Sequence, residues 1–166
     1  MGGSFYTDFQ QVQRDVKAGK FRNESELKQA FVEALKAVLR QACNRYIAEN
    51  MLVPALDERI KSRRPDIWIS NVIIEIEPPG SGLDAGLKQL KTYMQELYNK
   101  VRGAVDVYGL VTDGNDAEVW ILNVNGEPRK MLSGSMPDMV DNLLRMFCSS
   151  KIPVTNPEEL VRLFGV

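Results

Sequence analysis

The chain has 166 residues, 44% of them hydrophobic, which is enough for one buried core and predicts a single domain over 1–166. Its 21 basic and 22 acidic residues give a net charge of −1, so it has no overall basic signature for nucleic acid, and any basic contact surface must be local. The complete absence of histidine excludes Ser-His-Asp and Cys-His hydrolases and most zinc sites, which leaves carboxylate and lysine chemistry.

Two helices are predicted in the first third of the chain. Apolar residues recur at helical spacing from Asn23 to about Asn50, and a weaker pattern from Phe5 to Val16 predicts a short leading helix. Asn23 can cap the longer helix, and Glu26, three residues later, fits a capping box. The short apolar run 52–56 is interrupted by proline and predicts an edge strand at best.

The start of the chain has no basic region followed by an apolar run, and no apolar stretch is long enough to cross a bilayer. We therefore expect a cytoplasmic protein without a membrane segment. Cys43 and Cys148 fall in or near apolar helical patterns, which favours two small buried residues over a disulfide.

A hairpin is predicted next, because the β-branched runs 65–69 and 72–77 are separated by Ser70 and Asn71 alone. Prolines and glycines at 78–82 end the second run. The remaining patterns predict a helix over 83–100, strands over 105–111 and 117–124, a helix over 137–147 and a short helix from 157. This order predicts an α/β fold with a mixed central sheet flanked by helices.

Three acidic side chains share one face of the predicted hairpin. If Ser70 and Asn71 form a two-residue turn, Asp66 faces Glu75, and Glu77 lies on the same face because strand side chains alternate. Unpaired like charges on adjacent strands are destabilising, and a divalent cation such as Mg²⁺, which prefers oxygen ligands, would offset them. The alternative is a solvated face, since antiparallel strands often alternate apolar and polar residues.

This segment resembles the PD-(D/E)XK nuclease superfamily, because Arg64-Pro65-Asp66 precedes an apolar strand that ends in Glu75-Ile76-Glu77. The resemblance implies a restriction-endonuclease-like core of order α-β-β-β-α-β-β over about 23–147, with short helical extensions at both ends. It also implies hydrolysis of phosphodiester bonds in DNA with Mg²⁺ or Mn²⁺ as the cofactor.

Two further motifs extend the resemblance to about Asn23–Val124. Gln89 and Tyr93, four residues apart on a predicted helix, resemble the Gln-x-x-x-Tyr motif of an exonuclease-related branch. The segment 108–114, with Trp120 on the return strand, is similar to a hairpin in the nuclease domains of type I restriction enzyme R subunits.

The resemblance assigns roles to individual residues. It implies catalytic roles for Asp66, Glu75, Glu77 and Lys88. It implies metal ligation by Asp66, Glu75, the Ile76 carbonyl and a helix glutamate, preferably Glu26 over Glu33. It also implies DNA contacts by Arg63, Arg64, Lys88, Gln89 and Tyr93. The lysine of the superfamily falls at Glu77, so Glu77 is a base, a second-metal ligand or a mark of lost catalysis, and Lys88 is an alternative lysine.

Three interpretations follow from this departure. The first is an active nuclease that works alone, as a homodimer or with a partner subunit. The second is a catalytically inactive binding or assembly module of the same fold. The third is a carboxylate-rich globular domain with no nucleic-acid role, and the acidic sequence pI of about 5.6 favours it.

Overall fold

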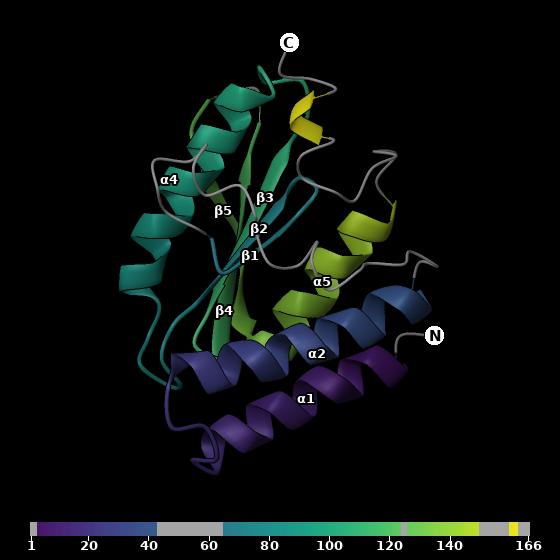
Figure 1. Cartoon of the computed structure of the whole chain (residues 1–166), viewed down its shortest axis with the longest axis vertical. Coiled ribbons are helices and arrows are strands. Elements are labelled where there is room, and N and C mark those ends of the chain that lie inside the picture. Colours follow the sequence, from purple (N-terminus) through teal and green to yellow (C-terminus); the bar gives the residue numbers. More distant parts are fainter. Residues whose placement is uncertain (1–2, 43–64, 124–125, 150–159, 163–166) are drawn as a thin grey trace.

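The computed structural model describes residues 3–42, 65–123, 126–149 and 160–162. A five-stranded mixed sheet of order β1-β2-β3-β4-β5 lies between helices (Figure 1). The helices are α1 (Gly3–Lys17), α2 (Glu24–Ala42), α4 (Asp84–Lys100) and α5 (Met136–Ser149), and the strands are β1 (Ile67–Ile69), β2 (Val72–Ile76), β3 (Val107–Thr112), β4 (Asp116–Leu122) and β5 (Arg129–Ser135). The predicted α/β class is confirmed, and the predicted strand at 52–56 lies outside the described residues.

Three of the four neighbouring strand pairs in the sheet are antiparallel, and one is parallel. β1 with β2, β3 with β4 and β4 with β5 are antiparallel, whereas β2 with β3 is parallel. A parallel pair needs a crossover connection, and α4 supplies it. β5 is an addition to the predicted order, and almost all of its residues are exposed.

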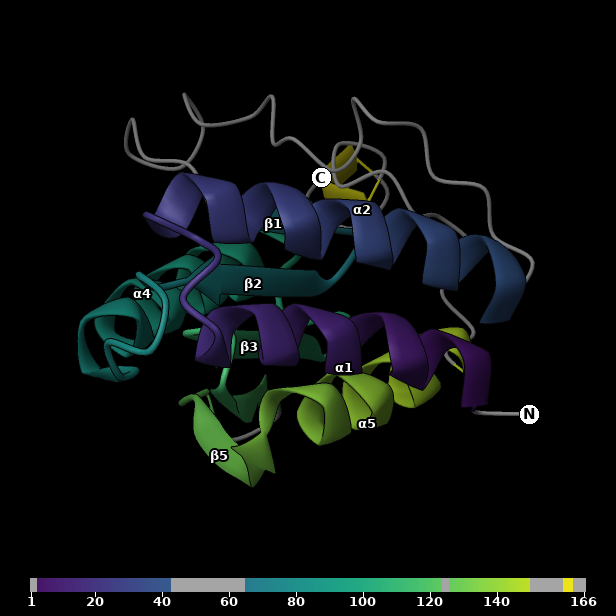
Figure 2. The same ribbon diagram turned by 90° about the horizontal axis from the view of Figure 1, so that it is seen from below.

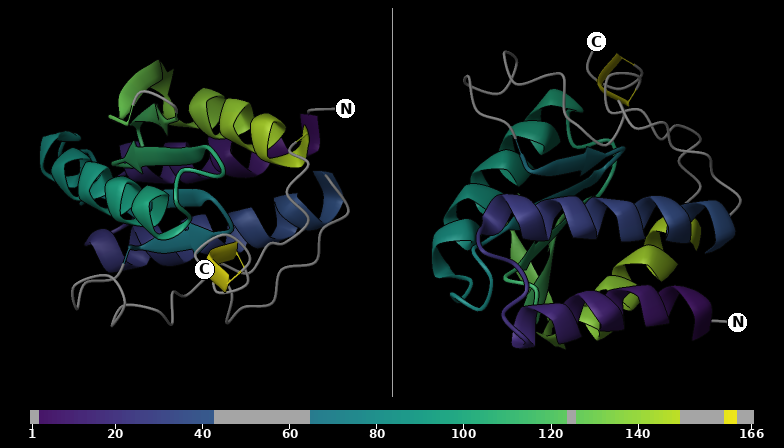
Figure 3. Two further views of the ribbon diagram at one scale, coloured as in Figure 1. Left: turned by 90° about the horizontal axis from the view of Figure 1, so that it is seen from above. Right: turned by 60° about the horizontal axis from the view of Figure 1, so that its bottom comes forward.

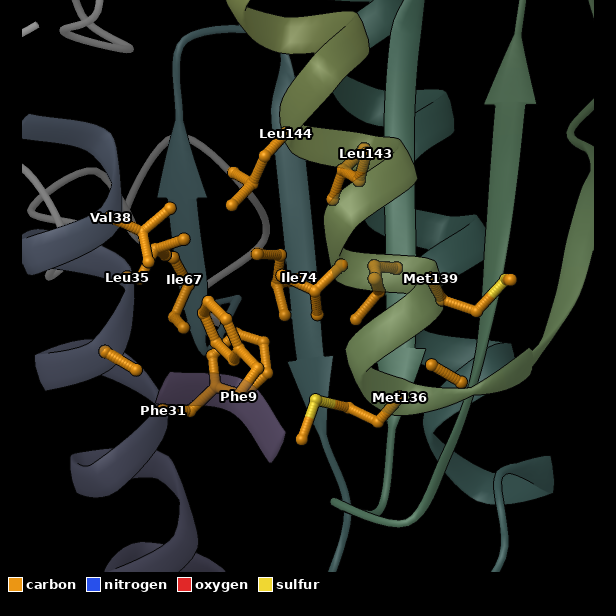
Figure 4. Close-up of a cluster of buried hydrophobic side chains, with 14 of the residues drawn as sticks. Phe9, Phe31, Leu35, Val38, Ile67, Ile74, Met136, Met139, Leu143 and Leu144 are labelled. Atoms are coloured by element: carbon orange, nitrogen blue, oxygen red, sulfur yellow. The ribbon is translucent and has the colours of Figure 1, made fainter. Parts of the chain in front are cut away.

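Helices cover both faces of the sheet. On one face, α1, α2 and α5 pack against β-strand residues such as Ile74, and the aromatic rings of Phe9 and Phe31 meet there with centroids 5.0 Å apart (Figures 2 and 4). On the other face, α4 packs against Trp68 and Ile73. Figure 3 shows the same layers from two further directions. The predicted leading helix, α1, therefore contributes to the main core.

The described residues bear on a membrane segment and on the state of one cysteine. None of the described helices is long and apolar enough to cross a membrane. Cys148 is disulfide-bonded, so the expectation of a small buried residue outside any disulfide was wrong. The other cysteine of the sequence, Cys43, lies outside the described residues. Helical periodicity could not reveal the bond, because a disulfide depends on how distant segments pack.

Gly109 lies where β3 passes directly beneath α4. A Cβ atom at this position would come within 2.5 Å of Met94 Sδ and 2.9 Å of Leu90 Cδ1, and both side chains are fully buried. We expect Gly109→Ala to lower the free energy of unfolding by about 1–3 kcal/mol through overpacking. Urea unfolding would measure this loss.

Gly134 in β5 provides the matched control, since a Cβ atom there would meet Met139 Cε at 3.4 Å, an ordinary contact. Gly134→Ala should change the free energy of unfolding by less than about 0.5 kcal/mol, as most surface substitutions do. An equal loss of unfolding free energy in the two variants would show that the close approach of α4 to β3 does not limit the size of the side chain at position 109.

Candidate functional site

The hairpin forms as the sequence predicts, around Ser70 and Asn71. Ile69 pairs with Val72, and Ser70 adopts a positive φ of 51°, as a two-residue hairpin turn allows. The Trp68 indole donates a hydrogen bond to the Ser70 carbonyl at 2.9 Å, and the Asn71 side-chain amide donates to the Asp106 carbonyl at 2.8 Å. These two bonds satisfy polar side chains at and beside the turn.

The same register brings Asp66 and Glu75 together, and their predicted proximity is confirmed. The Asp66 backbone N–H donates to Glu75 Oε2 at 2.9 Å, and the Ile76 backbone N–H donates to Asp66 Oδ2 at 2.8 Å. The side chain of each acid therefore bonds to the opposite strand. Glu75 is 2% exposed, so its carboxyl group is almost removed from water.

Two more carboxyl groups lie near this pair, Glu77 after β2 and Glu24 at the start of α2. Burial, and then the charge of Asp66, raises the pKa of Glu75 to about 8. Burial, and then the charge of Asp66, raises the pKa of Glu24. Burial, and then the charge of Glu24, raises the pKa of Glu77. We refer to Glu24, Asp66, Glu75 and Glu77 as the acidic cluster.

Glu77 also serves the N-terminus of α4. The Gly86 backbone N–H donates a hydrogen bond to the Glu77 carboxylate, and a Cβ atom at position 86 would lie only 2.7 Å from Glu77 Oε2. Leu83, which precedes the helix, makes no side-chain capping bond. A helix N-terminus carries free N–H groups and partial positive charge, so it favours a carboxylate over a lysine at position 77.

Lys28 on α2 places a cation against the acidic cluster. Its Nζ lies 3.5 Å from Asp66 Oδ1. Its charge also partly offsets the burial and the Asp66 repulsion that raise the pKa of Glu24, one helical turn earlier. Neither Lys28 nor Glu24 was among the residues predicted from the sequence. Their i, i+4 spacing on one helix face was the available signal, and such pairs are common on helix surfaces.

Glu26 caps α2 instead of joining the cluster. Its Oε1 accepts a hydrogen bond from the Arg22 backbone N–H at 2.7 Å, its Oε2 accepts from the Arg22 guanidinium at 2.8 Å, and its own N–H donates to Asn23 Oδ1 at 3.0 Å. The glutamate that α2 contributes to the acidic cluster is therefore Glu24 and not the predicted Glu26.

The predicted residues on α4 separate into two groups. Tyr93 is 4% exposed and packs with Trp68 and Ile73. Ile73 and Glu75 are two residues apart on β2, so Tyr93 lies on the same face of the sheet as Glu75. Gln89 and Lys88 are exposed. Lys88 follows Gly86 by two residues, which is roughly 200° around the helix, so it points away from Glu77. Arg63 and Arg64 lie outside the described residues.

The oxygen donors of Asp66 and Glu75, next to the Ile76 main chain, suit a hard cation such as Mg²⁺ or Mn²⁺. Among the described residues, however, no three or more Asp, Glu or Cys side chains are close enough together to hold a metal ion. The type of donor atom suits the cation, but the described side chains as they lie do not form a metal-binding group.

Comparison with known proteins adds nothing to these observations. No protein-family model matches the chain, and neither the curated proteins nor the solved structures contain a match. The resemblance to the PD-(D/E)XK superfamily therefore rests on the residues of this chain alone.

Proposed function

We propose that this chain is a metal-dependent nuclease of the PD-(D/E)XK type that hydrolyses phosphodiester bonds in DNA. The observation that carries the proposal is the pair of reciprocal hydrogen bonds that set the carboxyl groups of Asp66 and Glu75 side by side. A solvated polar face would leave these groups in water, whereas Glu75 is buried among like charges. Perturbed carboxyl groups of this kind cluster at functional sites.

In the proposed site, Asp66 and Glu75 hold the cation together with the Ile76 carbonyl. Bound Mg²⁺ or Mn²⁺ would supply Lewis-acid stabilisation of the charge on the scissile phosphate and an activated water. Glu24 adds a carboxylate from α2, and Glu77 holds the N-terminus of α4. Arg63, Arg64, Lys88 and Gln89 remain the proposed DNA contacts, and the cations among them would position the phosphates without reading sequence. Tyr93 is buried in the core, so its predicted contact with DNA is not kept.

The test is to incubate the purified full chain with plasmid, linear duplex and single-stranded DNA in Mg²⁺, Mn²⁺ or EDTA. We expect cleavage of at least one DNA form that needs a divalent cation and stops in EDTA. The same EDTA-insensitive background on all three DNA forms would reject the nuclease proposal. The three substrates also separate endonuclease from exonuclease action, because only an exonuclease requires a free end.

A second candidate function is a catalytically inactive DNA-binding module, and the position of Glu77 favours it. Glu77 stands where the superfamily has its lysine and accepts a hydrogen bond from α4. Such a module would bind DNA in a salt-dependent way without cleaving it, because phosphate contacts release counterions. If Glu77→Lys then gained metal-dependent nicking, the missing lysine would explain the inert native protein. Absence of DNA binding at low salt would exclude this module too.

A further inference from the structure

We propose that β5 is a dimer interface, at which it pairs in the antiparallel direction with β5 of a second copy of this chain. β5 is the last strand in the order of the sheet, and among the described residues no strand pairs with its outer edge. Figure 2 shows β5 beside α5, at the margin of the molecule. Such an edge presents main-chain N–H and C=O groups to which a further strand can bond.

The exposed apolar side chains of the described residues lie together on this strand. Met131 is 40% exposed and Leu132 is 38% exposed, and in that part of the chain no other large hydrophobic side chain is exposed. The pairing of β5 with β4 passes directly from Leu132 to Lys130, so Met131 is the extra residue of a β-bulge. A second strand at this edge would remove both apolar side chains from water, which favours association.

The charges of β5 and α5 match each other in a two-fold arrangement. With Leu132 opposite Leu132 of the second copy, and with the bulged residue allowed for, Arg129 of one copy lies opposite Gly134 of the other. Gly134 has no side chain, so the arginine can cross it toward the first turn of α5, where Asp138 is exposed. Asp138 lies close to β5, because its Oδ2 accepts a hydrogen bond from the Ser135 hydroxyl at 2.9 Å. This match is between the chain and itself, which favours a second copy over an unrelated strand.

The lysine of β5 does not oppose this pairing. Lysine on an edge strand usually discourages a further strand, because its charge would be buried or brought near a like charge. Lys130 Nζ lies 3.8 Å from Glu118 Oε2 on β4, so its charge is partly offset within its own copy. In the proposed arrangement Lys130 lies opposite Ser133 of the second copy, and no like charges face each other.

Sedimentation velocity of the full chain over a wide range of protein concentration tests the interface. We expect the native chain to form a dimer whose fraction rises with concentration. Leu132→Lys should raise the dissociation constant of the dimer by at least about tenfold, because it replaces an apolar contact at the two-fold axis by two like charges. Leu132 is exposed in one copy, so this variant should fold, and circular dichroism checks that it does.

A reversal of charge tests the arrangement of the two strands. Arg129→Glu should weaken the dimer, and the double variant Arg129→Glu, Asp138→Lys should recover much of the loss, because the pair is present with its signs exchanged. Lys88→Glu is the matched control, since Lys88 is an exposed basic residue on α4, which packs mainly against β2 and β3. Its dimer should dissociate as the native dimer does. If the double variant does not fold, Leu132→Lys decides the proposal alone.

These measurements need neither DNA nor metal, so their outcome is independent of the nuclease proposal. A native chain that stays monomeric at every concentration would show that β5 does not pair. A Leu132→Lys variant that dimerises as well as the native chain would place the interface elsewhere and would equally overturn the proposal. A folded double variant that dimerises no better than Arg129→Glu would overturn the antiparallel arrangement of the two strands.

Discussion

Replacing Glu75 by glutamine is expected to remove most of the loss of stability that the native protein suffers between about pH 4.5 and pH 8. The pKa of Glu75 is about 8 in the folded protein, against an ordinary value of 4.5. Below pH 4.5 Glu75 is protonated in both the folded and the unfolded protein, so the charge costs the folded state no stability. Between these values the unfolded chain releases a proton that the folded protein retains, so stability falls as pH rises.

The size of this effect follows from the pKa difference. One pKa unit corresponds to about 1.4 kcal/mol, so the interval from 4.5 to about 8 corresponds to a loss of about 5 kcal/mol, complete above pH 8. Glutamine is neutral at every pH and its side-chain oxygen can still accept the Asp66 N–H. Glu75→Gln should therefore be more stable than native protein at pH 8 and nearly equal to it at pH 5.

Urea unfolding in EDTA at pH 5, 6, 7 and 8 measures both profiles. Glu33→Gln, which changes an exposed glutamate paired with Lys36, is the control and should follow the native profile. Glu77→Gln should move the native transition to lower pH, because the charge of Glu77 raises the pKa of Glu75. Parallel profiles for native protein and Glu75→Gln would show that Glu75 is not the buried acid that controls stability.

Local sequence rules predicted the hairpin and its acidic pair correctly. A loop of only Ser70 and Asn71 fixes the register, and the alternation of strand side chains then fixes the face. Nothing from distant parts of the chain was needed to bring Asp66 beside Glu75. Helical periodicity was equally sufficient for α1, α2, α4 and α5, since each has a broad apolar stripe.

β5 escaped prediction because it lies at the edge of the sheet and is exposed almost throughout. Without a buried face, Arg129–Ser135 shows no alternation of apolar and polar residues. The register also shifts opposite Val119 and Trp120, which breaks the period of two. Its position depends on pairing with β4, which the segment's own residues do not specify.

The choice of charged residues from the helices depended on tertiary packing. Glu24 and Glu26 are both in the first turn of α2, and the sequence does not say which meets the hairpin. Glu26 bonds to Arg22, whereas Glu24 lies near Asp66. In the same way, Lys28 and Lys88 each lie on a helix beside the sheet, but only Lys28 faces Asp66. Such contacts join segments far apart in the chain.

Asp66→Asn is expected to reduce metal-dependent DNA cleavage by at least about 100-fold, since loss of even a group that only orients a metal ligand costs 10–100-fold. The substitution removes a negative charge and replaces one carboxylate oxygen with an amide nitrogen, a poor ligand for Mg²⁺. The remaining side-chain oxygen can still accept the Ile76 N–H, so the hairpin should persist. Loss of the Asp66 charge also relieves repulsion on Glu75.

Asp15→Asn is a closely matched control for this variant. Asp15 forms an ion pair with Lys20 at 3.4 Å and its side chain is 24% exposed, whereas the Asp66 pair with Lys28 is at 3.5 Å with 18% exposure of the acid. Both substitutions remove one carboxylate charge from a similar pair, but Asp15 belongs to α1 and lies outside the acidic cluster. Asp15→Asn should therefore cleave DNA at the native rate and bind Mn²⁺ with native affinity. Native cleavage by a folded Asp66→Asn variant would remove Asp66 from the metal site, because a ligand that can lose its charge without effect does not hold the cation.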